Sequence, residues 1–186
     1  MHLKIIRYIC AIAASAALLA GCGWLSGGPA DVNVSVCINE FMASNTDSTF
    51  VDEYGETDDW IELYNYGDES VSLDELFLTD DSKDLQEYAL PDISIPSKGY
   101  YLVWADNDPS QGENHAAFKL SALDGEEVIL SARNGVIIDQ VQFFIGTETY
   151  GKILPDESYG RQSDGDTAWG IQSTPTPGKP NAGIVP

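Results

Sequence analysis

Residues 129–138 have the sequence ILSARNGVII, in which Asn134-Gly135 separates two short apolar runs. Asn-Gly is strongly favoured in the two-residue turns of β-hairpins, because these turns need positive φ angles that asparagine and glycine tolerate. The flanking runs are rich in isoleucine and valine, as strands are. The stretch therefore predicts an antiparallel pair of strands, Glu127–Leu130 and Val136–Phe144.

Similar β-rich runs, bounded by turn residues, occupy much of the chain after residue 33. Further strands are predicted at Val34–Phe41, Trp60–Asn65, Leu76–Thr79 and Tyr100–Trp104, with shorter ones at Val71–Leu73 and Tyr88–Leu90. Clusters of Gly, Pro, Asn and Asp lie between them and favour turns. Many short strands at this spacing are typical of an all-β domain, either an antiparallel sandwich or a barrel.

Several motifs follow one another in a recognisable order. They are Ile38-Asn39-Glu40-Phe41, Asp59-Trp60-Ile61-Glu62-Leu63-Tyr64-Asn65, Leu78-Thr79-Asp80-Asp81, Gly99-Tyr100-Tyr101-Leu102-Val103, Tyr159-Gly160-Arg161 and Thr176-Pro177-Gly178-Lys179-Pro180-Asn181. Their order and spacing resemble those of the lamin tail domain family in its bacterial branch. The resemblance covers residues 34–182 and implies an immunoglobulin-like antiparallel β-sandwich, in agreement with the strand pattern. In bacteria such domains occur in secreted or surface proteins, sometimes beside nucleases or other enzymes.

The N-terminal residues have the pattern of an export signal. Lys4 and Arg7 precede an apolar and small-residue run from Ile9 to Ala20. A positive start, an apolar run and small residues before the cleavage site are typical of a secretory signal peptide. The tetrapeptide Leu19-Ala20-Gly21-Cys22 resembles the lipobox of bacterial lipoproteins, which implies cleavage before Cys22 and a lipid on its sulfur.

The alternatives at this end are a plain signal peptide or an uncleaved membrane helix, but the apolar run is shorter than the about 20 residues that a spanning helix needs. We predict a signal peptide at residues 1–21, a lipid-anchored flexible tether at 22–33, the sandwich domain at 34–182 and a tail at 183–186. We therefore expect an exported protein, lipid-anchored to the bacterial cell membrane or outer membrane and facing the periplasm or the exterior.

The chain is strongly acidic, with a formal net charge of −21. Removal of Lys4 and Arg7 with the signal peptide changes it to −21 − 2 = −23. Capture of nucleic-acid phosphates depends on Lys and Arg, so direct nucleic-acid binding is not expected. The same charge repels anionic lipid headgroups, and we expect membrane contact through the lipid on Cys22.

Asp139 is an acidic residue in an otherwise apolar strand pattern. Strand alternation places it on one face with Ile137, Val141 and Phe143. One interpretation is a catalytic acid. The other, which we favour, is a structural carboxylate that accepts hydrogen bonds from backbone N–H groups or pairs with Arg161, since an isolated buried charge is strongly unfavourable.

Residues 52–59 form an acidic loop, with Asp47 nearby. Calcium binds six to eight oxygen ligands, and clustered carboxylates can supply them. Asp47, Asp52 and Asp58 are the candidate ligands, although their spacing does not match an EF-hand loop. The alternative, which we favour, is a solvated surface loop in a chain that is acidic throughout. No other cofactor is expected.

Signals for an enzyme are few. His115 is the single histidine after the signal segment, and it lies in a loop-like stretch where we expect a solvent-facing or supporting role. No zinc-protease, nucleophile-elbow or phosphate-loop motif is present. Trp169 lies in a Gly- and Asp-rich, loop-like segment; it could stack on a sugar, but a plug at the end of the sandwich is the simpler interpretation.

The function expected from these features is a membrane-anchored, extracytoplasmic lipoprotein whose domain acts as a non-catalytic module for binding, adhesion or scaffolding. Its partner would be an envelope protein or a glycan. The alternative is a carboxylate- or metal-dependent hydrolase, or an accessory module of one, at the cell envelope. The fold family by itself does not decide between them.

Overall fold

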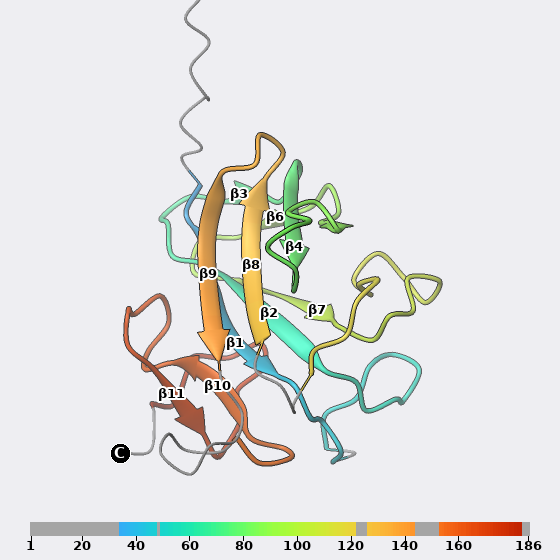
Figure 1. The fold of residues 1–186 in the computed structure, drawn as a ribbon. Coiled ribbons are helices and arrows are strands. Elements are labelled where there is room, and N and C mark those ends of the chain that lie inside the picture. The colour runs from blue at the N-terminus through green and yellow to red at the C-terminus, as the bar shows by residue number, and fades with distance from the viewer. Residues whose placement is uncertain (1–33, 48, 122–125, 144–152, 184–186) are drawn as a thin grey trace, which may run out of the picture. The chain divides into compact units, whose positions relative to one another are not determined.

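The computed structural model describes residues 34–183, apart from residues 48, 122–125 and 144–152 (Figure 1). These residues belong to the second of two compact units, Asp31–Pro186. The strands are β1 (Val36–Met42), β2 (Trp60–Asn65), β3 (Val71–Ser72), β4 (Leu76–Thr79), β5 (Tyr88–Ala89), β6 (Ser94–Ile95), β7 (Tyr100–Trp104), β8 (Glu126–Ala132), β9 (Ile137–Phe143), β10 (Ser158–Arg161) and β11 (Trp169–Gln172). Within the described ranges, no helix is long and apolar enough to cross a membrane.

Two antiparallel sheets make up most of this unit. One has the strand order β11-β10-β1-β2-β7 and the other the order β5-β4-β8-β9; a small ribbon joins β3 and β6. In Figure 1 strands β4, β8 and β9 cross in front of β1, β2 and β7. The described unit is therefore an all-β, immunoglobulin-like antiparallel sandwich, which confirms the predicted fold class.

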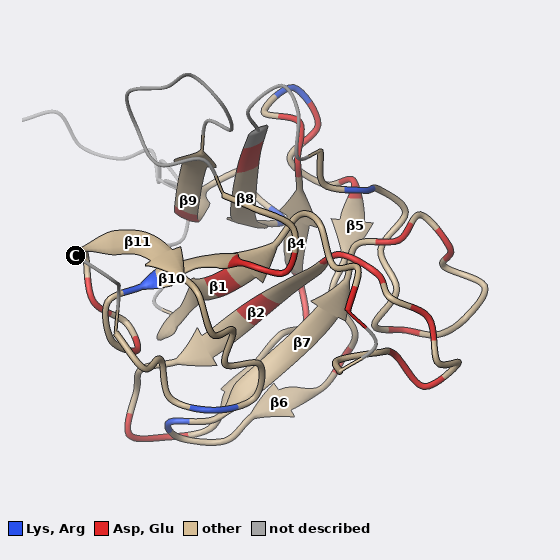
Figure 2. Cartoon of the chain, turned by 90° about the horizontal axis from the view of Figure 1, so that it is seen from below, with Lys and Arg blue, Asp and Glu red and all other residues tan. Residues whose placement is uncertain are grey.

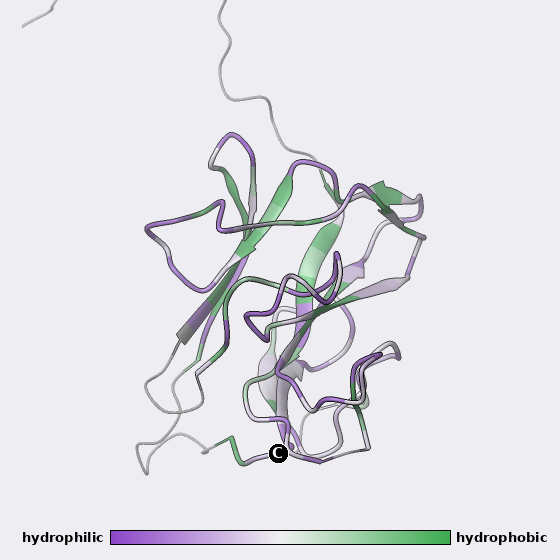
Figure 3. Ribbon diagram, turned by 90° about the vertical axis from the view of Figure 1, so that its right-hand side faces the viewer, coloured by the Kyte–Doolittle hydropathy of each residue, from purple (hydrophilic) through white to green (hydrophobic). Residues whose placement is uncertain are grey.

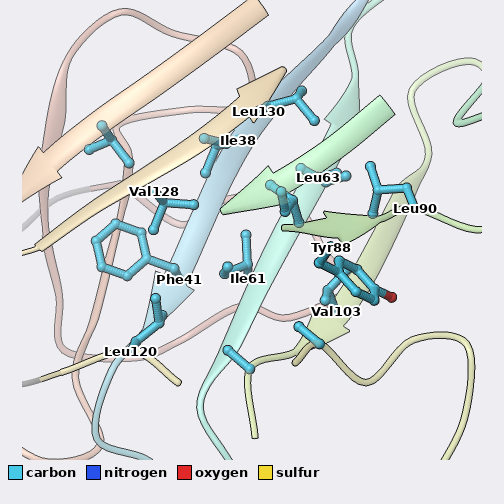
Figure 4. Packing of buried hydrophobic residues seen from close by; sticks show 14 of the residues in the cluster. Ile38, Phe41, Ile61, Leu63, Tyr88, Leu90, Val103, Leu120, Val128 and Leu130 are labelled. Atoms are coloured by element: carbon cyan, nitrogen blue, oxygen red, sulfur yellow. The ribbon is translucent and has the colours of Figure 1, made fainter. Parts of the chain in front are cut away.

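Side chains from both sheets fill the space between them. Ile61 and Leu63 of β2 face Val128 and Leu130 of β8 in one buried cluster (Figure 4). The rings of Phe41 and Phe143, from opposite sheets, have centroids 4.4 Å apart. Figure 3 shows the apolar residues on the central strands and the hydrophilic ones mostly on the loops. Burial of this apolar surface is the main force that holds the two sheets together.

The hairpin that the sequence predicts is present. β8 pairs with β9, and the N–H of Gly135 donates to the carbonyl of Ala132 at 2.8 Å. Gly135 has a φ of +78° but the φ of Asn134 is not positive, so the turn is not the two-residue type that needs two positive φ angles. Asp139, Val141 and Phe143 were predicted to share one face of β9 with Ile137, and this is wrong for Ile137. A bulge shifts the register between Leu130 and Ser131 and leaves Ile137 43% exposed. Alternation holds only while strand pairing is regular.

Three described strands were not predicted: β6, β10 and β11. β10 and β11 pair with each other and extend the first sheet beyond β1. Trp169 therefore lies in a strand and not in a loop, and it stacks on Tyr159 with 5.5 Å between ring centroids. β10 contains Gly160 and Arg161 where a typical strand has apolar residues, and it pairs with β1, more than a hundred residues earlier. β11 pairs with β10.

Candidate functional site

Asp139 and Arg161 meet at one edge of the sandwich. Arg161 Nη2 donates to Asp139 Oδ2 at 2.7 Å, and the side chains of Arg161 and Asp139 are 9% and 18% exposed, respectively. The main-chain N–H of Ile38 donates to the same carboxylate oxygen at 2.8 Å. Arg161 Nε donates to the carbonyl oxygen of Ile38 at 2.6 Å. The β1–β2 register shifts between Ile38 and Glu40, and beside this bulge the pair bonds to both the N–H and the carbonyl oxygen of Ile38. The pair therefore ties β9 and β10 to β1.

A shallow cavity of about 230 Å³ lies over this pair, lined by Val36, Cys37, Tyr66, Ile138, Asp139, Arg161 and Gly165. Its charged groups are already bound to one another and to the main chain. Burial raises the pKa of the Cys37 thiol to about 12, so this cysteine stays protonated and unreactive at neutral pH. The arrangement is suited to holding strands together.

A pair of acidic residues that was not predicted to form a site lies on the outer face of the five-stranded sheet. Glu40 of β1 and Glu62 of β2 are directly opposite each other, and both are 0% exposed. Burial raises the pKa of Glu62 from 4.5 to about 8, against the effect of its hydrogen bonds, and burial also raises the pKa of Glu40. A signal was available, because alternation puts Glu62 on one face with the aromatic residues Trp60 and Tyr64.

The segment that covers these carboxylates is the C-terminal clasp, residues 174–183. Thr176 donates to Glu40 twice, from its N–H at 3.0 Å and from its hydroxyl at 2.7 Å. The N–H of Gly178 donates to Glu62 Oε2 at 2.6 Å, while Asn39 Nδ2 donates to Oε1 at 2.9 Å. Ser158 donates a further hydrogen bond to Glu40.

Asn181 completes the clasp by donating to the carbonyl oxygen of Arg161 at 2.7 Å. The motif Thr-Pro-Gly-x-x-Asn therefore has a physical role, since its first, third and last residues all bind the outer face of the first sheet. The two glutamates act as acceptors that hold the end of the chain. Because their oxygens accept these hydrogen bonds, the two glutamates are suited to holding the C-terminal clasp in place and not to transferring a proton to a substrate.

The acidic loop between β1 and β2 brings two of the three predicted metal ligands together. One oxygen each from Asp52, Glu56 and Asp58 lies within 4.8 Å of the others. Asp47 lies elsewhere: it is exposed, and its N–H donates to Asp156 Oδ1 at 2.8 Å. Burial and the neighbouring acids, chiefly Asp106, raise the pKa of Asp58. Figure 2 shows acidic residues along many loops of the domain.

His115 joins this cluster from the connection between β7 and β8. One ligand atom each from Asp52, Glu53 and His115 forms a second group within 4.8 Å. His115 is 0% exposed, so of the two predicted roles, solvent-facing or supporting, the solvent-facing one is wrong. Its Nδ1 is hydrogen-bonded to Asp106, and its Nε2 lies 3.3 Å from Glu53 Oε1. Burial opposes the charged imidazole, but the two carboxylates outweigh this and raise the pKa of His115 above 6.5.

A comparison with known families identifies the domain. The model of the family described as Lamin Tail Domain matches residues 29–144. The chain belongs to the lamin tail domain family. None of the curated proteins matches it.

The match to the lamin tail domain ends before β10, whereas the structure continues the same sheet through β10 and β11 to the C-terminal clasp. Glu40 and Glu62 lie inside the matched residues, and the clasp that binds them lies outside. Among the described residues, the lamin tail domain of this chain is thus completed by a segment that the family match does not include. Cys22, the predicted lipidation site, lies outside the described residues.

Proposed function

We propose that the protein is an exported lipoprotein, anchored by a lipid on Cys22, whose lamin tail domain is a non-catalytic binding or scaffolding module at the bacterial envelope. The lipobox-like sequence Leu19-Ala20-Gly21-Cys22 supports the anchor. Membership of the lamin tail domain family supports a module whose function depends on what its surface contacts.

One structural observation carries the non-catalytic part of this proposal. Glu40, Glu62, Asp139 and Arg161 are held by hydrogen bonds within the domain, to each other's strands or to the C-terminal clasp. A catalytic acid or base has to reach a substrate. These groups instead connect strands that are distant in sequence, so the frame is rigid and the loops are left as the contact surface.

The chemistry of the surface indicates the kind of partner. The whole chain has a formal charge of −21, which becomes −21 − 2 = −23 after loss of Lys4 and Arg7, so the mature protein attracts basic or cation-bearing surfaces and repels phosphate polymers. An envelope protein with a basic patch meets this description. A glycan, the other proposed partner, would be bound through the polar groups of the loops. Electrostatic complementarity of this kind raises the association rate and makes it depend on salt.

The test compares two kinds of variant of the full chain, purified in detergent, for binding to envelope material from the bacterial host. Glu62→Gln and Asp139→Asn change frame carboxylates, whereas Asp47→Asn with Glu56→Gln removes two of the six negative charges of the loop between β1 and β2. We expect the frame variants that remain folded to bind like the wild type and the loop variant to bind less tightly, with a weaker salt dependence. Equal binding by both kinds of variant, at all salt concentrations, would count against a loop-mediated module.

The alternative of a metal-dependent hydrolase has one observation in its favour, the grouping of Asp52, Glu53 and His115. It predicts metal-stimulated cleavage of ester, phosphodiester or glycoside substrates that disappears in His115→Gln. The proposed module predicts no turnover above the uncatalysed rate with Zn²⁺, Mn²⁺ or Ca²⁺ added.

A further inference from the structure

Two loops meet beyond one end of the five-stranded sheet. The first is the connection between β1 and β2, and the second is the connection between β7 and β8. Tyr54 of the first loop donates from its hydroxyl to the carbonyl oxygen of Gln111 in the second at 2.8 Å. Gln111 Nε2 in turn donates to Glu56 Oε2 at 2.8 Å. The two loops are thus bound to each other directly, and their polar side chains face a common space.

That common space holds buried polar atoms that lack a hydrogen-bond partner. Asp52 is 7% exposed, and its Oδ1 accepts from the N–H groups of Tyr54 at 2.9 Å and Glu56 at 2.7 Å. Its Oδ2 is buried and has no hydrogen-bond partner, and the same holds for His115 Nε2. Buried polar atoms are nearly always satisfied in proteins, so two such atoms in one group indicate a missing partner.

His115 is held with Nε2 directed at this group. Its Nδ1 bonds to the buried carboxylate of Asp106, whose other oxygen accepts from the N–H of Asp108 at 2.9 Å. The main chain on either side is also fixed, because Trp104 bonds to Asn114 and Ala116 at 2.8 Å each. A histidine that binds a metal ion typically donates its second ring N–H to a carboxylate, which sets the tautomer and orients the ring.

Glu53 supplies the third candidate ligand. Its Oε1 lies 3.3 Å from His115 Nε2, close enough for an ion pair, but the two atoms are not aligned for a hydrogen bond. Its side chain is 50% exposed, so an ion can enter from this side. Glu56 and Asp58 lie next to Asp52 and add negative charge around the same point.

We propose that His115 Nε2, Asp52 Oδ2 and the Glu53 carboxylate bind one divalent transition-metal ion of the zinc class. One imidazole nitrogen with two carboxylates is a donor set found for zinc and its neighbours. Calcium and magnesium prefer oxygen ligands alone, so the imidazole favours zinc over the calcium considered from the sequence. The ion would fasten the two loops together at one end of the sandwich. This inference does not depend on the lipid anchor or on the envelope partner.

The competing description is a protonated His115 clamped between Asp106 and Glu53 with no metal. Zinc titration of the full chain, purified in detergent without a histidine tag and freed of metal by a chelator, separates the two. We expect one zinc ion bound per chain, with a rise in melting temperature and little effect of calcium at the same concentration.

Variants locate the site. Asp52→Asn and Glu53→Gln should each weaken zinc binding at least 10-fold, and Asp106→Asn should weaken it about 10- to 100-fold through the orientation of His115. Asp47→Asn, in the same loop but outside both groups, is the matched control and should bind zinc like the wild type. Circular dichroism checks that each variant is folded, and Glu53→Gln, at an exposed side chain, keeps the test valid where a buried variant unfolds.

No saturable zinc binding by the wild type would overturn the proposal. So would equal affinity in the wild type and folded Glu53→Gln, or tighter binding of calcium than of zinc. The measurement uses the purified chain alone, so its outcome is independent of whether the protein is lipidated or binds an envelope partner.

Discussion

Replacement of Asp139 by alanine removes the carboxylate that joins three strands. It leaves Arg161, whose side chain is 9% exposed, without its acidic partner, and it leaves the N–H of Ile38 without an acceptor. Loss of one partner of a buried ion pair destabilises a protein by about 3–5 kcal/mol. For a domain of this size each kcal/mol lowers the melting temperature by about 2–4 °C, so Asp139→Ala should melt about 6–20 °C below the wild type.

The assay is urea and thermal unfolding followed by circular dichroism, with Asp139→Asn as the matched control. The asparagine keeps an oxygen that can accept from Ile38 and loses only the charge, so a smaller loss is expected. Binding to envelope material should persist in Asp139→Ala wherever the variant is folded. A loss of stability below about 1 kcal/mol, or loss of binding in a fully folded variant, would show that Asp139 is not a structural carboxylate.

Further measurements address other buried groups. Folding raises the pKa of Glu62 from 4.5 to about 8. Between pH 4.5 and pH 8 the folded state therefore binds a proton that the unfolded state does not, and the stability that this proton contributes is lost as pH rises through 8. The stability of the wild type relative to Glu62→Gln should therefore fall by about 1.4 kcal/mol per pH unit across this window, and a flat difference would contradict the raised pKa. Gly160→Ala places a Cβ 2.4 Å from Gln172 Nε2 and 3.1 Å from Glu40 Cγ. Because Gln172 is buried and its Nε2 donates to the carbonyl oxygen of Arg161 at 3.1 Å, the side chain cannot move away freely, and the fold should lose about 1–3 kcal/mol in denaturant titrations. Cys37 should react with a maleimide only after unfolding, because burial raises the pKa of its thiol to about 12; rapid reaction of the folded chain would show that it is accessible.

Much of the central sandwich can be predicted from the sequence, because its strands alternate or carry a local turn signal. The stretch around Asn134-Gly135 contains its own turn, and β2 and β7 combine aromatic and β-branched residues within a few positions. β10 and β11 carry no comparable local pattern. β10 pairs with Glu40 and Phe41 of β1, more than a hundred residues earlier, and short-range periodicity cannot report a contact of that length. Among the described strands β11 pairs with β10 alone, so its place in the sheet follows from that of β10.

The buried carboxylates also differ in how far the sequence alone predicts their role. Asp139 stands out in the sequence as a charge in an apolar strand, and that pattern is enough to favour a structural role over a catalytic one. Glu62 is marked in the sequence by its alternation with Trp60 and Tyr64, but the donors that make the burial of Glu40 and Glu62 tolerable are not. These donors come from Thr176 and Gly178, 136 and 116 residues away. Buried carboxylates depend on such partners, and a single sequence does not state which residues meet.

The acidic loop between β1 and β2 shows that sequence spacing alone does not identify metal ligands. From spacing alone Asp47, Asp52 and Asp58 are equivalent candidates, but the turn at residues 52–56 directs Asp52 inward while Asp47 binds the N–H of Thr49. His115, from a different loop, supplies the nitrogen that changes the expected ion from calcium to zinc. Ligand identity here is set by tertiary contact between two loops.

The most direct single measurement is the intact mass of the full chain expressed in bacterial cells and recovered from their membrane and aqueous fractions, together with the mass of its N-terminal peptide. We expect the mature chain to begin at Cys22, to lack residues 1–21 and to carry the added mass of a diacylglyceryl group with its acyl chains. The Cys22→Ala variant should lose that mass and leave the membrane fraction. A chain that retains Met1 or begins elsewhere without lipid, and is recovered from the aqueous fraction, would contradict a lipid-anchored lamin tail domain protein.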